Sequence, residues 1–280
     1  MVFYKNHLPL SNNHIKEIRM KRLHTWITGI LLFVCLVPFT AQAAGIELSI
    51  GGWKQSPGGN LSIKAVSELD NLSIKDDLKY GNETRLMGRI KIDTPLFFPN
   101  IYLMATPMNF KEIGSKNTSF TFGDNTFNAN TPFTSELKLD HYDVGFLYGI
   151  PLLKTATTGI LNIDLGLNAR IIDFKARITG QDSITLQTVT ESKALVIPMP
   201  MLYAGFQVKP VKWIALEGEA RGITYGKNHY YDLVGRVKVR PFGPIFAAAG
   251  YRYEKVKIDM DDVKAKVDFG GPFAEVGLEF

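Results

Sequence analysis

The sequence has only one cysteine in 280 residues, and that cysteine lies in the N-terminal segment. A single thiol excludes an internal disulfide framework and a multi-cysteine zinc module. Charged residues make up 21% of the chain and hydrophobic residues 45%, which excludes an intrinsically disordered protein. After residue 44 the sequence has no apolar run long enough for a transmembrane helix, and no long segment with apolar residues at helical spacing. Helical fold classes are therefore disfavoured.

The N-terminal segment has the order of an export signal. A short basic stretch, Met20–His24, precedes an apolar run at 26–39 and a small-x-small triplet. This order predicts a secretory signal peptide; the alternative, a membrane anchor, would need a longer run that Pro38 does not interrupt. We expect an N-terminal extension and signal peptide at 1–43 and a separate mature domain at 44–280. The residues expected around the cleavage site are Ala41, Ala43 and Ala44.

The basic charge of the chain depends largely on the predicted signal peptide. The full sequence has 32 basic and 27 acidic residues, a net charge of +5. Residues 1–43 contain five of the basic residues and one of the acidic ones, so the mature chain has 27 and 26, a net charge of +1. This near-neutral balance excludes nucleic acid as an expected partner.

The mature sequence alternates between apolar and polar residues, which is the period of a β-strand with two different faces. At 161–171, for example, Leu, Ile and Ala residues alternate with Asn, Asp, Gly and Arg residues. Tight, mostly proline-containing turns separate some of these blocks, and generally longer polar loops are expected at 57–82, 113–132, 179–192, 226–229 and 259–264. Ten blocks are found, at about 45–56, 83–95, 100–112, 133–149, 159–178, 193–209, 213–225, 230–241 and 244–258, with a tenth that ends the chain at 274–280.

Ten strands with short turns at one end and long loops at the other are typical of an outer-membrane barrel. We therefore predict an all-β protein, a ten-stranded antiparallel up-and-down transmembrane β-barrel. A soluble barrel or sandwich with its apolar face inward would show the same alternation. Strands of about 12–18 residues favour the membrane, because they are longer than those of soluble sheets and long enough to cross lipid.

Aromatic residues near the strand ends also favour a membrane, because such rings settle at headgroup depth. The residues expected there are Trp53, Tyr80, Phe97, Phe98, Tyr148, Tyr203, Trp213, Tyr225, Tyr230 and Tyr231.

The last strand carries the form of a barrel-insertion signal, with alternating apolar residues and a terminal phenylalanine: Val276, Leu278 and Phe280. In this orientation the apolar faces contact lipid, as we expect for Leu161, Ile163, Leu165, Leu167 and Val237. The polar faces line the lumen, where charged groups must pair or stay hydrated. The lumen charges expected are Arg89, Asp143, Asp164, Arg170, Glu217, Glu219, Arg221, Arg236 and Arg252.

The stretch 92–103, Ile-Asp-Thr-Pro-Leu-Phe-Phe-Pro-Asn-Ile-Tyr-Leu, resembles a strand, a Pro-x-x-x-Pro-Asn turn and the next strand of a family of small proteobacterial outer-membrane β-barrel proteins. Gly51-Gly52-Trp53, followed by the glycine pair at 58–59, adds to this resemblance. The family has no settled biochemical role. The resemblance therefore implies the fold and a location in the Gram-negative cell outer membrane, and it supplies no catalytic residues.

The sequence favours a structural or surface-interaction role without enzymatic activity. A narrow channel for small solutes is one alternative, in which Arg236, Lys238 and Arg240 would form an anion-selective ring; we prefer pairing of this strand with Glu217 and Glu219. A rim-site lipid or peptide hydrolase or transferase is the other alternative, with His141 or His229 as the base.

We expect no catalytic residues, no cofactor and no metal site, and we interpret the loop aspartates as solvated charges. The expected partners are outer-membrane lipids and lipopolysaccharide, together with the barrel assembly machinery during insertion. The sequence favours a monomer.

Overall fold

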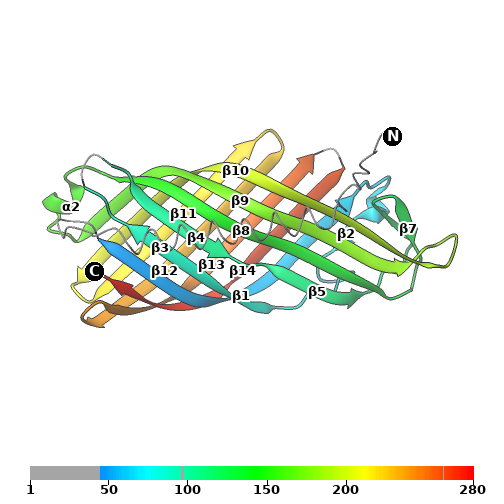
Figure 1. The fold of residues 1–280 in the computed structure, drawn as a ribbon, viewed down its shortest axis with the longest axis horizontal. Coiled ribbons are helices and arrows are strands. Elements are labelled where there is room, and N and C mark those ends of the chain that lie inside the picture. The colour runs from blue at the N-terminus through cyan, green and yellow to red at the C-terminus, as the bar shows by residue number, and fades with distance from the viewer. Residues whose placement is uncertain (1–44, 96–97, 261) are drawn as a thin grey trace, which may run out of the picture. The chain divides into compact units, whose positions relative to one another are not determined.

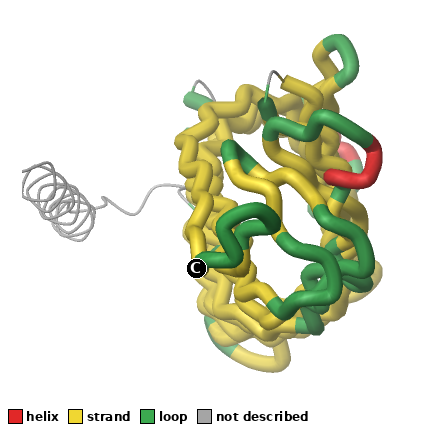
Figure 2. Tube along the Cα trace, turned by 90° about the vertical axis from the view of Figure 1, so that its right-hand side faces the viewer, coloured by secondary structure: helices red, strands yellow, loops and turns green. Residues whose placement is uncertain are grey.

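The computed structural model describes residues 45–95, 98–260 and 262–280. The predicted signal peptide, with Ala41, Ala43 and Ala44, lies outside the described residues, as does Phe97. The described chain forms one antiparallel sheet in which each strand pairs with its neighbours and β14 pairs with β1, so that the sheet closes on itself. Viewed from the end that carries β2 and β7, the strands form a ring (Figure 2).

The predicted ten-stranded barrel is confirmed. β4 and β5 are two parts of one wall position, because both pair with β8. The wall strands are β1 (Ile46–Ile63), β3 (Glu83–Ile92), β4 (Asn100–Thr106) with β5 (Asn109–Gly114), β8 (Phe133–Gly149), β9 (Leu161–Gln181), β10 (Thr188–Val211), β11 (Ile214–Tyr225), β12 (Asn228–Phe242), β13 (Ile245–Met260) and β14 (Val263–Glu279).

The two ends of the barrel differ (Figure 1). The inner end carries the chain terminus and the tight turns, one of which contains a short helix that the sequence did not predict, α2 (Leu153–Ala156). The outer end carries the remaining small elements, which fold over the rim: η1 (Glu68–Asp70), β2 (Leu72–Ser73), β6 (Phe120–Phe122) and β7 (Asn125–Phe127). None of the described helices is long and apolar enough to cross a membrane.

The predicted outer loops are shorter in the structure, and two of them are shortened the most. β1 continues to Ile63, although a loop was expected from residue 57. β9 and β10 reach Gln181 and Thr188, so the loop expected at 179–192 is reduced to the residues between them. The loop expected at 113–132 contains the β6–β7 hairpin. These strands extend because alternation continues past the predicted ends, but with the two faces exchanged.

The exchange of faces is clearest on β9. In the part nearer the inner end, Leu165 and Leu167 are exposed on the outer wall, whereas Asp164 and Arg170 are buried inside. Beyond Ile171, which is exposed, the adjacent residue is also isoleucine, and the polarity of the two faces inverts. The inward residues that follow are apolar and buried: Ile172, Phe174, Ala176 and Ile178.

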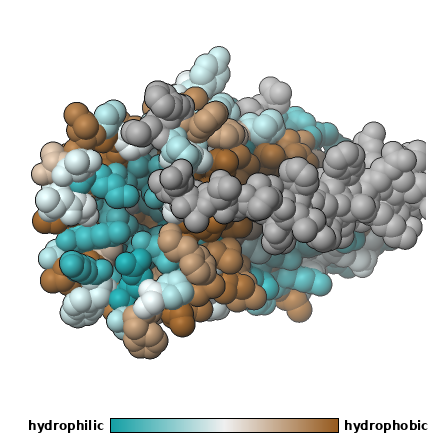
Figure 3. Space-filling model, turned by 60° about the vertical axis from the view of Figure 1, so that its left-hand side comes forward, coloured by the Kyte–Doolittle hydropathy of each residue, from teal (hydrophilic) through white to brown (hydrophobic). Residues whose placement is uncertain are grey.

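The same inversion occurs on the other long strands. On β8, Leu137 and Leu139 are buried inside the outer part, and His141 and Asp143 are buried inside the inner part. On β14, Val267 and Phe269 are buried inside the outer part, and Glu275 is buried inside the inner part. We call the part with apolar outer walls the membrane half and the part with an apolar interior the outer half. Figure 3 shows hydrophilic residues at the middle of the inner end, with hydrophobic residues around them.

The predicted orientation, with apolar faces outward and polar faces inward, therefore holds in the membrane half and is reversed in the outer half. A strand needs about 9–11 residues to cross a bilayer, and β9 and β10 have 21 and 24. Roughly half of each projects beyond the lipid, where the outer wall meets water and the interior takes the apolar residues. The barrel thus changes from the polarity of a membrane protein to that of a soluble one along single strands.

The predicted aromatic positions are partly wrong for the same reason. Tyr148, Trp213, Tyr225 and Tyr231 are exposed near strand ends, as is Phe98 in its turn. The other described members of the set are buried and cannot reach headgroups from there: Trp53, Tyr80, Tyr203 and Tyr230.

The boundary between the two halves can be tested with one arginine. We expect Leu167→Arg, in the membrane half, to lower the free energy of unfolding by about 2–4 kcal/mol, because the charge enters hydrocarbon. Thr188→Arg, on the outward face of the outer half, should change it by no more than about 0.5 kcal/mol. Urea titration of the protein folded in phospholipid vesicles measures both. Equal losses in the two variants would contradict the assigned boundary.

Candidate functional site

An ionic network fills the interior of the membrane half, and Asp232 of β12 is at its centre. Its carboxylate is fully buried and accepts hydrogen bonds from three guanidinium groups. The donors are Arg170 at 2.5 Å, Arg221 at 2.9 Å, and Arg252 at 2.8 and 3.0 Å. Glu254 stands directly opposite Asp232 on β13. Two adjacent carboxylates repel each other, so the surrounding arginines are needed to keep both charged.

Arg170 spans the lumen. Its guanidinium donates to both oxygens of Asp143 on the neighbouring strand β8, at 2.8 and 2.9 Å. The same group also donates to Asp232 on β12. Asn168 donates a further hydrogen bond to Asp143, at 2.6 Å. Since bidentate arginine–carboxylate pairs are strong and directional, this residue ties opposite walls together and obstructs the lumen.

His141 lies within the network. Its Nδ1 is 3.1 Å from the carbonyl oxygen of Leu139, and its Nε2 is 3.3 Å from Glu254 and 3.2 Å from Arg252. Arg252 also donates to the Thr106 hydroxyl at 2.9 Å. Both ring nitrogens of His141 thus have close polar neighbours, and the imidazole is buried.

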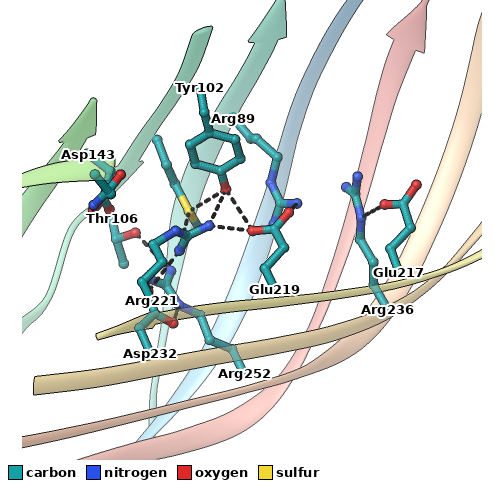
Figure 4. A network of polar contacts seen from close by, with 12 residues as sticks. Arg89, Tyr102, Thr106, Asp143, Glu217, Glu219, Arg221, Asp232, Arg236 and Arg252 are labelled. Carbon is teal, nitrogen blue, oxygen red and sulfur yellow. Dashed lines mark hydrogen bonds and ion pairs between the residues drawn. The ribbon is translucent and has the colours of Figure 1, made fainter. Parts of the chain in front are cut away.

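A second part of the network surrounds Tyr102 (Figure 4). The Tyr102 hydroxyl donates to Glu219 at 3.1 Å and accepts from Arg221 at 2.6 Å. Arg221 also pairs with Glu219, and Arg89 donates to Glu219 at 2.7 Å. The Arg221 guanidinium lies 4.7 Å from the centre of the Tyr102 ring, which adds a cation–π contact.

A third cluster lies nearer the inner end. Arg236 pairs with Glu47 at 2.6 Å and with Glu217 and Glu275. Lys238 pairs with Glu47, Glu217 and Glu279 at 2.8 to 2.9 Å. The predicted pairing of this strand with Glu217 is therefore present. The predicted pairing with Glu219 is wrong.

Glu219 is instead bound by Arg89 and Arg221. Arg240, the third basic residue of the predicted ring, is partly exposed and lies 3.4 Å from Glu279. Lys91 pairs with Asp164 at 2.7 Å, so the expected Asp164 also has a partner.

The structure places the expected lumen charges inside the barrel. The buried ones are Arg89, Asp143, Asp164, Arg170, Glu217, Arg221, Arg236 and Arg252. Glu219, the remaining member of the set, is half-buried, and 11% of its side chain is exposed. Of the expected lipid-facing residues, Leu165, Leu167 and Val237 are exposed and Leu161 and Ile163 are half-buried. The residues of the expected insertion signal, Val276, Leu278 and Phe280, lie exposed at the end of β14.

A cavity of about 270 Å³ lies above the network, inside the outer half. Tyr230 and Glu254 belong to its lining, and apolar side chains form most of the rest. Sequence reasoning missed this cavity, because it assigned the apolar residues of these strands to the lipid. The adjacent apolar pair at 171–172 is the signal that could have revealed the exchange of faces. The aliphatic lining includes Leu137, Leu139, Ile172, Leu195, Ile197, Val256, Ile258, Val263 and Val267.

The β6–β7 hairpin and its flanking loops cap one side of the outer rim. Phe120 packs 5.3 Å from Phe127 and 5.1 Å from Phe133 of β8, between ring centres. Asp70 holds the cap to η1, because it accepts hydrogen bonds from the backbone N–H groups of Thr121, at 2.6 Å, and Ser67, at 2.8 Å. Burial raises the pKa of Asp70, but these hydrogen bonds outweigh it and lower the pKa below its usual value.

Among the residues that the structure describes, no group of three or more histidine, cysteine, aspartate and glutamate side chains is arranged to hold a metal ion.

The closed sheet, the apolar outer wall and the enclosed ionic groups meet the requirements of a bilayer together. A closed barrel leaves no unpaired backbone edge in lipid. Its apolar outer wall contacts acyl chains, while its charges are kept inside. This protein is an outer-membrane β-barrel. The barrel has an even number of strands, and its first strand, β1, begins and its last strand, β14, ends at the inner side, which is the form found in Gram-negative outer membranes.

No family model and no curated protein matches the chain. Among solved structures, the translocator domain of the autotransporter NalP from Neisseria meningitidis is 13% identical, with a TM-score of 0.43, over 94% of this chain and 98% of that chain. Ail, the attachment invasion locus protein of Yersinia pestis, is 13% identical with a TM-score of 0.34, over 85% and 100%. The P. putida toluene transporter TodX is 8% identical with a TM-score of 0.28, over 86% and 90%.

These solved structures are outer-membrane β-barrel proteins. At such identities and TM-scores, the similarity assigns neither a family nor a function to this chain. The resemblance of residues 92–103 to one particular barrel family therefore stays a prediction.

Removing one member of the network should destabilise the barrel strongly, because it leaves the remaining charges buried without a partner. Asp232→Asn removes the charge that three buried arginines share, so we expect the free energy of unfolding to fall by about 3–5 kcal/mol. The matched control is Asp173→Asn, which removes a partly exposed carboxylate 2.7 Å from Lys138 and should cost no more than about 1 kcal/mol. Urea unfolding in vesicles measures both. A loss in Asp232→Asn as small as in the control would show that the network does not stabilise the barrel.

Proposed function

We propose that this protein is a sealed, non-enzymatic outer-membrane barrel with a structural or surface-interaction role. The observation that carries the proposal is the position of Arg170, which joins Asp143 on one wall to Asp232 on the other. All three side chains are fully buried. A conducting lumen needs a continuous wet path, and these groups occupy its centre.

The cluster around Arg236 and Lys238 supports a second seal below the first. Arg236 pairs with Glu47 of β1, Glu217 of β11 and Glu275 of β14, so one guanidinium joins three strands. Barrels of about eight strands have interiors that side chains just fill, and ten strands lie near that limit. The ion pairs therefore account for the volume that a solute channel would need.

The surroundings of His141 and His229 argue against a rim-site enzyme. His141 is buried and surrounded by Glu254 and Arg252, away from the outer rim. His229 stacks on Tyr231 with ring centres 5.2 Å apart. Burial, and then Lys257 and Lys255, lower the pKa of His229. A general base needs a positioned substrate proton and usually an orienting partner, and neither histidine is placed with a serine or aspartate dyad.

The outer loops support an interaction role. They are tied to each other and to the barrel: Lys64 pairs with Asp124 at 2.7 Å, and the Ser183 N–H donates to the carbonyl of Thr126 at 2.8 Å. On this fixed frame, large apolar side chains point into solvent, with exposed fractions of 84% for Val66 and 85% for Ile184. These exposed side chains supply apolar contact points for another surface, because burying them against it removes them from water.

The seal predicts the electrical behaviour of the protein. We expect the purified barrel, inserted into a planar lipid bilayer, to give no discrete current steps above those of the bare bilayer, because ion pairs close the lumen. A general porin inserted in the same way serves as the positive control. Reproducible single-channel steps from this protein would refute the sealed barrel and favour the channel.

The exposed tips predict adhesion to apolar surfaces. Cells that produce the protein should adhere to hexadecane droplets more than cells that lack it, and Val66→Ser combined with Ile184→Ser should remove most of the increase. Lys75→Ser, in the same outer loop as Val66, is the polar control and should leave adhesion unchanged. The fraction of cells that leave the aqueous phase measures the effect. If the double variant adhered as well as the unchanged protein, the apolar tips would have no part in surface contact.

A further inference from the structure

The barrel wall has a side opening in the outer half. β10 pairs with β9 along its whole outer part, but it pairs with β11 only from Leu202 toward the inner end. The β11–β12 hairpin turns at residues 226–227, well before the level at which β9 and β10 turn, as Figure 1 shows. Within the described chain, the edge of β10 above Leu202 therefore has no second partner strand.

The sequence itself specifies this opening. Pro198 and Pro200 lie on β10 just above Leu202, where pairing with β11 stops. Proline has no N–H group and cannot donate to a neighbouring strand, so it is found at the edges of sheets. Two prolines at alternate positions prevent β11 from closing the wall further along β10. At the top of the opening, Lys193 of β10 reaches to 3.8 Å from Asp262 of the β13–β14 turn.

The opening leads to the cavity in the outer half. Leu195 and Ile197 of β10 and Ile258 of β13 line the cavity and are only half-buried. They are thus the apolar side chains at the entrance. On the outside of the same edge, Val196 and Leu202 are exposed. The entrance therefore borders the apolar outer wall, at the level where the membrane half ends.

The floor of the cavity is polar but already paired. The Tyr230 hydroxyl donates to Glu254 at 2.9 Å, and both groups are buried. The other oxygen of Glu254 is ion-paired with Arg252 at 2.5 Å. A ligand is therefore not needed to satisfy these groups, and the walls above offer few polar groups to water. A cavity lined in this way favours an apolar occupant.

The charges of the lining indicate an uncharged ligand. The lining contains one cation, Lys193, and two anions, Glu254 and Asp262. Lys193 is partly exposed at the rim, 3.8 Å from Asp262, and the lining carries one more negative than positive charge. An anionic ligand would lose its hydration in an apolar site of net negative charge, which is costly.

The volume limits the size of the ligand. A cavity of about 150 Å³ with a similar lining holds one benzene ring. The cavity here, about 270 Å³, is nearly twice as large. We propose that it binds one uncharged apolar molecule of about ten carbon atoms, which enters through the side opening between β10 and β13. This goes beyond the proposed surface role and does not depend on it.

The test uses naphthalene and the full mature barrel in phosphatidylcholine nanodiscs. Equilibrium dialysis of radiolabelled naphthalene, corrected with empty nanodiscs, should show saturable binding at one molecule per barrel. Ala265→Trp fills the cavity from β14 and should weaken binding about tenfold or more. Ala274→Trp, on the lipid-facing side of the same strand, is the matched control and should bind as the unchanged protein does. Leu195→Trp fills the cavity from β10 and replaces Ala265→Trp if that variant does not fold.

The outcomes separate the proposal from its alternatives. Binding no greater than that of empty nanodiscs would overturn it, as would equal binding by the filled and unfilled barrels. If 2-naphthoate bound as tightly as naphthalene, the uncharged ligand class would be wrong. The measurement is independent of conductance and adhesion, so its failure leaves the proposed function unaffected.

Discussion

The structure depends on one constraint: its wall passes from lipid into water part of the way along single strands, and the interior must change with it. Where the outside is hydrocarbon, charged side chains can be accommodated only inside the barrel. Where the outside is water, the hydrophobic effect drives apolar side chains inward. Ile171 and Ile172 mark the boundary on β9, because one faces outward and the next faces inward. The ionic network and the cavity above it follow from this change.

The two interiors use different physics. In the membrane half, burial of charge is costly, and stability requires that each charge have partners. Asp232 illustrates this, since three arginines from three other strands converge on it. In the outer half, side chains such as Phe174 and Phe269 pack without polar partners, and imperfect packing leaves space. The ionic network of the membrane half therefore forms the floor of the less tightly packed apolar interior of the outer half.

Much of the fold could be predicted from the sequence, because a strand with two different faces shows as alternating apolar and polar residues. The ten strands, their order and their inner turns follow from alternation and prolines. The contacts across the lumen did not follow, because alternation says which face a residue occupies but not which distant strand it meets. Glu219 shows this: it was expected to pair with β12, yet it meets Arg89 of β3.

The apolar interior of the outer half was missed for a different reason. Apolar and polar residues alternate with a period of two both before and after the two faces exchange, so the period alone does not reveal the exchange. Each block was therefore given a single orientation. The doubled isoleucine at 171–172 records the change, but it carries meaning only when the membrane boundary is known. The buried Trp53 was likewise assigned to the headgroups, since position along a strand does not show the depth of the ring.

The two prolines on β10 have a consequence for encounters between molecules. An unpaired strand edge is a template on which another chain can extend the sheet, and this leads to fibre growth or strand exchange. The N–H groups of every second residue of β10 point to this edge and would have to donate hydrogen bonds to an added strand. Pro198 and Pro200 remove two successive donors of this kind. The same residues that hold the wall open thus also make its exposed margin a poor template for addition of a foreign strand.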